Sequence, residues 1–257
     1  MNRRVVSVDS LPALRGALFV QPHCDDAVLS SFGLLARAVS GTVVTVFAGV
    51  PGLDTPRRSG GTVPPGITPH GWMTARRTED SEALARFHVG VVHLDFLELQ
   101  FRDDPDETGL VGDITRAVRE QCSASVTAIV APLGIGGNPN HLQVAAAVRS
   151  VSLETGVPVV WCADYPYAAR PSWPAWVEGN GALPGEWAER FEALGAGGHD
   201  CTVAVLTTVE QRAKIDAFSV YASQVAATEK GDEHAVSDPS HLRIETYLSP
   251  SGVMAGG

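Results

Sequence analysis

This chain of 257 residues lacks long apolar runs, runs of basic residues and closely spaced cysteines. Its few cysteines lie far apart, with no Cys-x-x-Cys pair: Cys24, Cys122, Cys162 and Cys201. This spacing argues against a disulfide framework or a structural zinc knuckle, and favours isolated reduced thiols that fill a core.

The charge balance is acidic. The chain has 19 Lys and Arg against 29 Asp and Glu, which gives a formal net charge of −10. No run of Lys or Arg is available to neutralise several phosphates along a groove. We therefore expect no nucleic-acid partner.

No apolar stretch reaches the roughly 20 residues that a membrane span needs. Arg3 and Arg4 near the amino terminus are not followed by the apolar region of a signal peptide, because Asp9 and Pro12 interrupt the sequence there. We expect a soluble cytoplasmic protein with a small-molecule substrate and no membrane partner. The sequence leaves open whether it forms a homo-oligomer.

Short apolar, β-branched runs alternate with longer segments of helical period. The runs predict strands over Ala17–Gln21, Thr42–Phe47, Val89–Leu94, Thr127–Ala131, Val157–Trp161 and Thr202–Leu206. The segments between and after them predict helices over Ala27–Val39, Thr74–Phe87, Leu110–Gln121, Leu142–Leu153 and Val209–Val225. On the second helix, the spacing predicts that Arg76 and Asp80 pair at i,i+4 on the face toward water.

This alternation predicts the fold. Hydrophobic types make up 44% of the chain and charged types 19%, enough for a large core. Apolar strands that are each followed by a helix form parallel sheets covered on both faces. We expect residues 1–257 to form a single α/β domain, Rossmann-like and three-layered, with a mostly parallel sheet. Long loops at about 49–71 and 165–185 interrupt the alternation and are expected to border the active site.

Chemically active side chains follow two of the predicted strands. His23, Asp25 and Asp26 come after the first, and His141 lies in the segment after the fourth. Ligands of open parallel sheets bind at the carboxyl ends of the strands. Imidazoles and carboxylates suit zinc or iron(II) with coordination positions left open. Asp25 and Asp26 have a simpler interpretation as helix caps, but one Asp would suffice for that, so the combination favours a catalytic metal site.

With these residues in this order, the chain resembles the LmbE/PIG-L family of metal-dependent N-deacetylases. The hallmark of that family is a His-Pro-Asp-Asp block after strand one and a later His-x-Asp-His block. His23-Cys24-Asp25-Asp26 is similar to the first block, whereas Asn138-Pro139-Asn140-His141 matches only the last position of the second. The likeness continues through Arg76-Arg77-Thr78-Glu79, Leu94-Asp95-Phe96, Asp164-Tyr165-Pro166-Tyr167, Tyr221-Ala222-Ser223-Gln224 and Glu245-Thr246-Tyr247, and so covers nearly the whole chain.

The resemblance implies an LmbE-like hydrolase domain of secondary metabolism. It implies hydrolysis of an N-acyl amide, most simply N-acetyl, on an amino-sugar-like or related small molecule. The implied metal is zinc, or another divalent ion such as Fe²⁺, held by His23, Asp26 and His141, with Asp25 as general base. The residues implied to bind the substrate are Arg76, Asp95, Asn138, Asn140 and Tyr167.

The first block has Cys24 in place of the usual Pro and is followed by Ala27 where many members have Glu, and two positions of the second block also depart from the family pattern. Asn138 and Asn140 stand where family members have a His and an Asp that serve in protonating the leaving amine, and neither amide can act as a general acid. Either Asp25 carries the proton in both directions, or the reaction differs from ordinary deacetylation, or activity is weak or lost.

Two other functions remain open at this point. His23-Cys24-Asp25 with His141 has the order of the His-x-Asp…His triad of non-haem iron oxygenases, although that motif usually sits on an antiparallel fold. The two asparagines also fit a family member that binds a metal or ligand without turnover.

Overall fold

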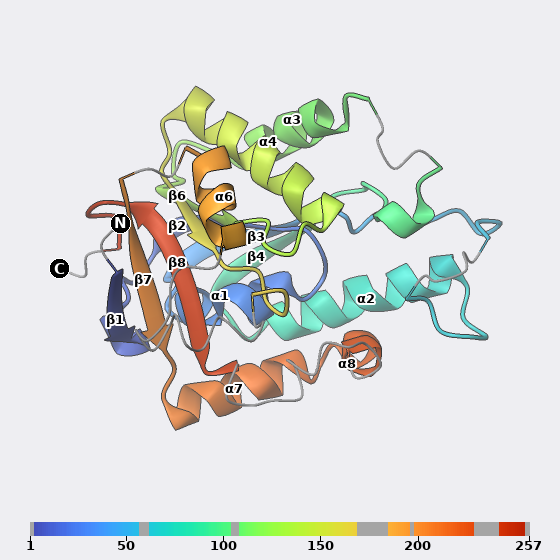
Figure 1. Cartoon of the computed structure of the whole chain (residues 1–257). Coiled ribbons are helices and arrows are strands. Elements are labelled where there is room, and N and C mark those ends of the chain that lie inside the picture. Colours follow the sequence, from blue (N-terminus) through green and yellow to red (C-terminus); the bar gives the residue numbers. More distant parts are fainter. Residues whose placement is uncertain are drawn as a thin grey trace.

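The computed structural model describes residues 3–56, 62–103, 108–168, 185–195, 198–228 and 242–254. The strands are β1 Arg3–Ser7, β2 Arg15–Gln21, β3 Ser40–Thr45, β4 Val89–His93, β5 Ala128–Pro132, β6 Val159–Cys162, β7 His199–Val205 and β8 Ile244–Pro250. They form one sheet in the order β1-β7-β8-β6-β5-β2-β3-β4 (Figure 1). Only β8 runs against its neighbours β6 and β7 among these described strands, so the predicted mostly parallel sheet is confirmed.

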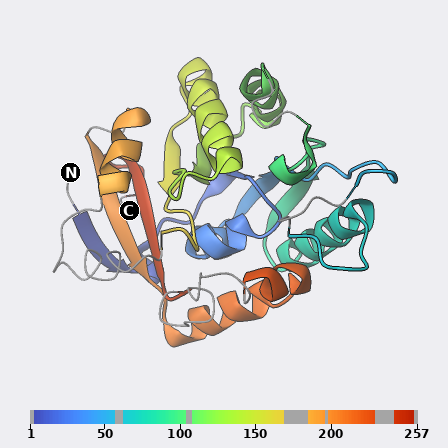
Figure 2. The same cartoon turned by 45° about the vertical axis from the view of Figure 1, so that its right-hand side comes forward.

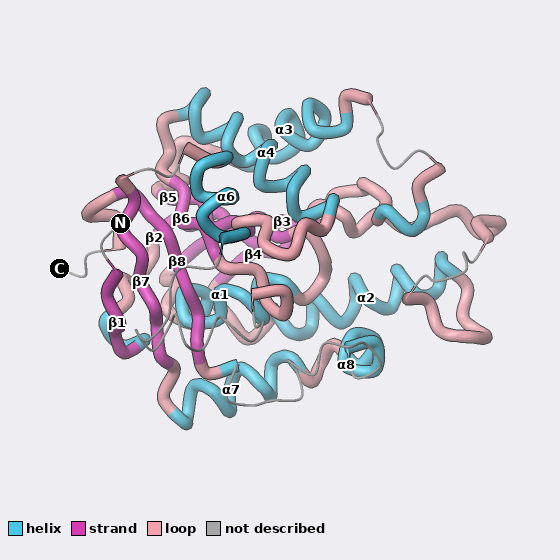
Figure 3. Tube along the Cα trace, viewed as in Figure 1, coloured by secondary structure: helices cyan, strands magenta, loops and turns pink. Residues whose placement is uncertain are grey.

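Helices cover both faces of the sheet, which confirms the predicted three-layer α/β fold. The helices are α1 Asp26–Ala36, α2 Pro69–Leu84, α3 Leu110–Gln121, α4 Pro139–Thr155, α6 Gly185–Ala193, α7 Thr208–Phe218 and α8 Ala222–Thr228. Helices α3, α4 and α6 lie on one side, and α1, α2 and α7 on the other, with α8 beside α2 (Figures 1 and 2). Figure 3 separates the strands from the two helical layers by colour.

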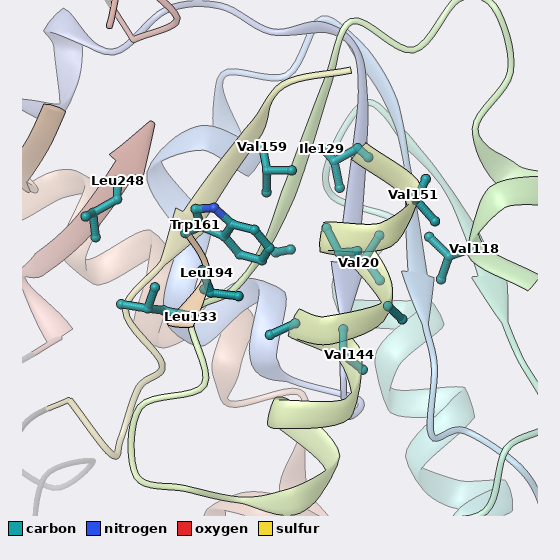
Figure 4. Packing of buried hydrophobic residues seen from close by; sticks show 14 of the residues in the cluster. Val20, Val118, Ile129, Leu133, Val144, Val151, Val159, Trp161, Leu194 and Leu248 are labelled. Carbon is teal, nitrogen blue, oxygen red and sulfur yellow. The ribbon is translucent and has the colours of Figure 1, made fainter. Parts of the chain in front are cut away.

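Alternate side chains of a strand point to opposite faces of the sheet, and this alternation divides the core into two clusters. On β2, Leu18 and Val20 pack under α3 and α4, whereas Ala17 and Phe19 pack against α1. Figure 4 shows residues of the first of these clusters, among them Val20 of β2 and Val144 of α4. Because β2 is buried on both faces, its packing holds the start of the following loop in place.

Three elements were not predicted from the sequence: β1, β8 and α6. The predicted helix over Val209–Val225 is instead two helices, α7 and α8, and α2 begins at Pro69, where Thr68 caps it by accepting the N–H of Gly71. The loop predicted over 49–71 therefore ends at Thr68, before the expected residue 71. Residues 57–61 of that loop, and 169–184 of the loop predicted over 165–185, lie outside the described residues.

Strand β8 is buried although it carries the charged residue Glu245, which has several partners. Glu245 pairs with Lys214 of α7 at 2.7 Å, and both side chains are buried. The Glu245 carboxylate also accepts the N–H groups of Phe32 and Gly33, at the point where Ser31 interrupts the helical backbone of α1. The Glu245 carboxylate thus stabilises the interruption at Ser31 in α1, the helix that begins with Asp26.

Among the described helices, none has the length and apolar character needed to cross a bilayer.

Candidate active site

The candidate site lies at the carboxyl ends of two adjacent strands. β2 and β5 pair in parallel, so the turn after β2, with His23 to Asp26, lies beside the start of α4, with His141. Topology alone brings these segments together, because parallel neighbours end at the same sheet edge.

Three side chains converge there. Asp26 Oδ2 lies 3.3 Å from His23 Nδ1 and 3.6 Å from His141 Nε2. One ligand atom of each residue lies within 4.8 Å of the others. Two ligands of one tetrahedral zinc ion lie about 3.4 Å apart, so the spacing fits a shared ion. His141 Nε2 is buried and has no hydrogen-bond partner, which an ion at this point would supply.

His141 is oriented by Asp164, which follows β6. His141 Nδ1 donates to Asp164 Oδ1 at 2.6 Å, and Asp164 Oδ2 accepts the N–H groups of Gly134 and Ile135 at 2.7 and 2.8 Å. With its proton on Nδ1, the ring presents the Nε2 lone pair toward Asp26. Burial acts to lower the pKa of His141, but the carboxylates of Asp26 and Asp164 raise it overall.

Asp164 was not assigned a role from the sequence. The available signal was its place directly after the strand beside β5, at the edge already occupied by His141.

Asp25 and Asp26 differ in environment although they are adjacent. Burial raises the pKa of Asp25 well above its usual value, and repulsion by Asp26 raises it further. Burial opposes the charge of Asp26 too, but His141 and His23 lower the pKa of Asp26 overall. In this pair, Asp26 therefore favours the charged form, and Asp25 takes up a proton more readily than an ordinary Asp.

The simpler interpretation of Asp25 as a helix cap is not supported. Asp25 precedes α1, yet its side chain makes no capping hydrogen bond. Its φ of 140° is one that side-chain-bearing residues rarely adopt. Such strain is a common feature of functional sites.

The second block forms a hydrogen-bonded rim beside the cluster of His23, Asp26 and His141. Asn138 caps α4 by accepting the N–H of Asn140, and donates to Tyr167 Oη at 2.9 Å. Tyr167 packs edge-on against the ring of His141, with 5.4 Å between centroids. The amide of Asn140 lies between Arg102 and His23.

A cavity of about 530 Å³ opens on this rim. Its lining comprises His23, Thr62, Arg76, Glu98, Leu99, Gln100, Gly136, Gly137, Asn138, Pro139, Asn140, Tyr167 and Gln224. Four of the residues expected to bind substrate are in this set. The fifth, Asp95, has an exposed carboxylate that pairs with Arg77 at 3.1 Å, and remains a prediction.

The prediction that Arg76 and Asp80 pair on a wet helix face is wrong. Both are buried, and Arg76 pairs with Glu98 on the cavity wall. A helical pattern cannot show that a charged face meets charged partners from distant segments.

Asp80 lies at the centre of a buried polar network behind the site. It accepts hydrogen bonds from Gln21, Thr45, His93 and Tyr221. Cys24, Asp80 and His93 also lie within metal-ligand reach of one another. Asp80 Oδ2 and His93 Nε2 are only 2.8 Å apart, however, which is the length of a hydrogen bond and shorter than the spacing of two ligands on one ion.

Gln21 links this network to the turn that carries His23, Asp25 and Asp26, because its Oε1 accepts the N–H of Ala27 at 2.7 Å. Burial raises the pKa of the Cys24 thiol well above its usual value, so this cysteine is a neutral packing group. All four cysteines are buried and free, as expected.

Fold and site together define an α/β protein whose parallel strands end at a cluster of residues able to bind a divalent metal. The model of the family "PIG-L: GlcNAc-PI de-N-acetylase" matches residues 18–152, more than half of the chain, and the chain belongs to this family. De-N-acetylation breaks an amide C–N bond, so family membership places the chain among the hydrolases.

Individual relatives are also deacetylases. The 2'-N-acetylparomamine deacetylase of Streptomyces fradiae is 30% identical over 170 residues, which span 60% of this chain and 58% of that protein. The chain thus matches less than two thirds of the length of this curated relative.

Solved structures of deacetylases share the fold. The zinc-inhibited form of the teicoplanin deacetylase Orf2 is 25% identical with a TM-score of 0.68, covering 92% of this chain and 97% of that one. A deacetylase–teicoplanin complex is 26% identical with a TM-score of 0.66, covering 92% and 98%. The N,N'-diacetylchitobiose deacetylase of Pyrococcus horikoshii, 16% identical with a TM-score of 0.51 over 84% and 73%, shows the fold alone.

The site and the relatives bear on two questions that the sequence left open: whether a metal is bound, and whether the protein is an oxygenase. The His23–Asp26–His141 cluster and the zinc-inhibited relative support a divalent metal. The family match and the mostly parallel sheet do not favour a non-haem iron oxygenase.

Proposed function

We propose that this protein is a zinc-dependent N-deacetylase acting on an N-acetylated amino-sugar-like small molecule. The observation that carries the proposal is the convergence of His23, Asp26 and the unpartnered Nε2 of His141 beside a protonatable Asp25. The two nitrogens and one carboxylate oxygen form a donor set that zinc accepts while keeping a position open.

The metal would supply a water of lowered pKa and would polarise the acetyl carbonyl. Asp25 accepts a proton from the attacking water as the C–O bond forms. Asp25 then returns that proton to the amide nitrogen as the C–N bond breaks, which releases acetate and the free amine. A raised pKa suits both steps, because a carboxyl that titrates nearer to neutrality accepts and releases protons more readily than an ordinary Asp.

Asn138 and Asn140 cannot give the amine its proton. Assigning both transfers to Asp25 removes the need for a second acid in that block. Tyr167 and the two amides would instead hold the substrate, as donors and acceptors for sugar hydroxyls.

The cavity supports a polar substrate larger than an acetamide. Its volume of about 530 Å³ is in the range of small-molecule sites. Arg76 and Glu98 face it as a paired cation and anion, which suits hydroxyl and amine groups. The named relatives act on such molecules, among them 2'-N-acetylparomamine and teicoplanin.

The test is acetate release from 2'-N-acetylparomamine, N-acetylglucosamine and N,N'-diacetylchitobiose by protein loaded with zinc, compared with chelator-treated protein. The proposal expects release from at least one of them that chelator abolishes and zinc restores. Release that is insensitive to chelator would contradict it. Zinc binding without any release would favour the second candidate, a binding protein without turnover, for which the two asparagines are the specific observation.

A further inference from the structure

We propose that Asn140, held by Arg102, places the proton of His23 on the nitrogen that faces the metal position, and thereby weakens metal binding by this chain. The inference rests on the proposed metal site, but not on the proposed reaction. It assigns to Asn140 a positioning role that acts through His23.

The amide orientation of Asn140 follows from its neighbours. Arg102 Nη2 lies 2.8 Å from Asn140 Oδ1, and a guanidinium can only donate. The oxygen of the amide therefore faces Arg102. The nitrogen, Nδ2, is left facing His23 Nε2 at 2.8 Å, and it can only donate.

This contact decides the tautomer of His23. A ring nitrogen that accepts a hydrogen bond has no proton, so the proton of the neutral ring lies on the other nitrogen, Nδ1. Nδ1 faces Asp26 Oδ2 at 3.3 Å, where it can donate. These three contacts are compatible with one another when no ion is bound.

An ion bound between His23 and Asp26 needs the other tautomer of His23, with the proton on Nε2. A ligating nitrogen must present a lone pair, so Nδ1 would lose its proton to Nε2. Two donors, Nε2–H and Nδ2–H, would then face each other. Turning the amide relieves that clash but sets Nδ2 against the Arg102 guanidinium, which again puts donor against donor.

Burial limits the access of water to Asn140 and Arg102, whereas His23 borders the cavity with its side chain 15% exposed. Asn140 is 3% exposed and Arg102 5%. A buried polar group that loses its partner is destabilised, because no solvent replaces the bond. Metal binding is therefore opposed by one mismatched contact wherever the amide points.

The other histidine shows the contrasting arrangement within the same site. His141 donates from Nδ1 to the carboxylate of Asp164, which leaves its Nε2 as a lone pair. An aspartate at position 140 would do the same for His23, since a carboxylate accepts from His23 and from Arg102 at once. Asn140 lacks that second acceptor.

The experiment measures zinc dissociation constants of the purified, folded proteins by competition with a chromophoric chelator. Asn140→Asp is expected to bind zinc at least about tenfold more tightly than the unaltered chain, the usual scale for such partners of metal ligands. Asn138→Asp is the matched control. It adds the same charge on the same rim but at a side chain that contacts Tyr167. An equal tightening in both variants would overturn the proposal, because charge alone would explain it.

Arg102→Met tests the direction in which Arg102 changes zinc affinity. In the Asn140 protein it frees the amide to turn, so zinc binding should tighten. In the Asn140→Asp background the same change should not tighten binding, because the carboxylate accepts in either case. Weaker binding by Arg102→Met in the Asn140 protein would contradict the proposal.

The tautomer can be read without any variant. Long-range ¹H–¹⁵N spectra of the metal-free chain should show His23 protonated at Nδ1, and Asn140→Asp should move that proton to Nε2. Protonation at Nε2 in the unaltered chain would overturn the inference. Tighter zinc binding by Asn140→Asp without acetate release would leave the inference standing and reject the proposed reaction, whereas no zinc binding by any variant would reject both.

Discussion

Asp25 and Asp26 are neighbours in the chain, yet their pKa values are shifted in opposite directions. Burial raises the pKa of Asp25, while His141 and His23 lower that of Asp26 against the effect of burial. Two carboxyls pushed apart in this way take different parts in acid–base chemistry. The account therefore assigns proton transfer to Asp25 and metal binding to Asp26.

Asp25→Asn should separate these two parts. The amide keeps the size of the side chain but cannot accept the proton, so the rate of acetate release should fall about 10²-fold or more while zinc content stays nearly unchanged. Zinc content is measured by elemental analysis of the dialysed protein. Asp26→Asn serves as the comparison, since it should lose zinc. Loss of zinc in the Asp25 variant would make Asp25 a ligand.

The raised pKa of Asp25 predicts a pH effect on the stability of the metal-free protein. The folded state holds this proton more tightly than the unfolded state. The associated stability is present at low pH and is lost as pH rises through the folded pKa. Asp25→Asn has no such loss, so it should melt at a higher temperature than the unaltered chain above that pH and alike below the ordinary Asp pKa. Thermal unfolding in chelator across pH checks this; a variant that melts lower at neutral pH would contradict it.

Asp164→Asn should weaken zinc binding without removing a ligand. The carboxylate accepts the His141 proton at 2.6 Å and two backbone N–H groups, so an amide would leave at least one donor mismatched. A loss of about 10- to 100-fold in zinc affinity is expected. Chelator competition measures it, and unchanged affinity would show that Asp164 does not orient His141.

Lys214→Met should destabilise the fold by about 3–5 kcal/mol, because Glu245 would be left charged and buried. Denaturant unfolding of the metal-free protein gives the change. Arg116→Met is the control, since Arg116 pairs with Asp113 on the surface and should cost less than about 1 kcal/mol. Equal effects of the two substitutions would refute the role of the buried pair.

Restoring the residues that the family has at positions 138 and 140 tests whether the reaction lacks a general acid there. Asn138→His with Asn140→Asp should preserve or raise hydrolysis of a simple acetamide, because the pair returns groups that can hold a proton. The rate of acetate release is compared with that of the unaltered chain. If the double variant loses activity on its true substrate while zinc still binds, the asparagines bind that substrate or serve another reaction.

The sequence predicted those parts of the fold that depend on local pattern. The strand before His23 and the strand before the Gly134 loop are continuous apolar runs, and their parallel pairing brought His23 near His141 as expected. Strand β8 was not predicted because Glu245 and Thr246 are polar, and the buried partner of Glu245 is Lys214, which lies far away in the chain.

The convergence of His23, Asp26 and His141 was predictable from the sequence, but the groups that hold them were not. Asp164, Asp80 and Arg102 act through contacts between segments distant in sequence, and no spacing rule reveals such contacts. The direction of the Asn140 amide likewise depends on Arg102, 38 positions earlier in the chain.

The most direct test of the account is anomalous diffraction from a crystal of the zinc-loaded protein. We expect one ion held by His23 Nδ1, Asp26 Oδ2 and His141 Nε2 at ~2.0–2.2 Å. Separation of these atoms by more than ~5 Å would contradict the account, because no single ion spans that gap. An ion bound instead by Cys24, Asp80 and His93 would contradict it equally.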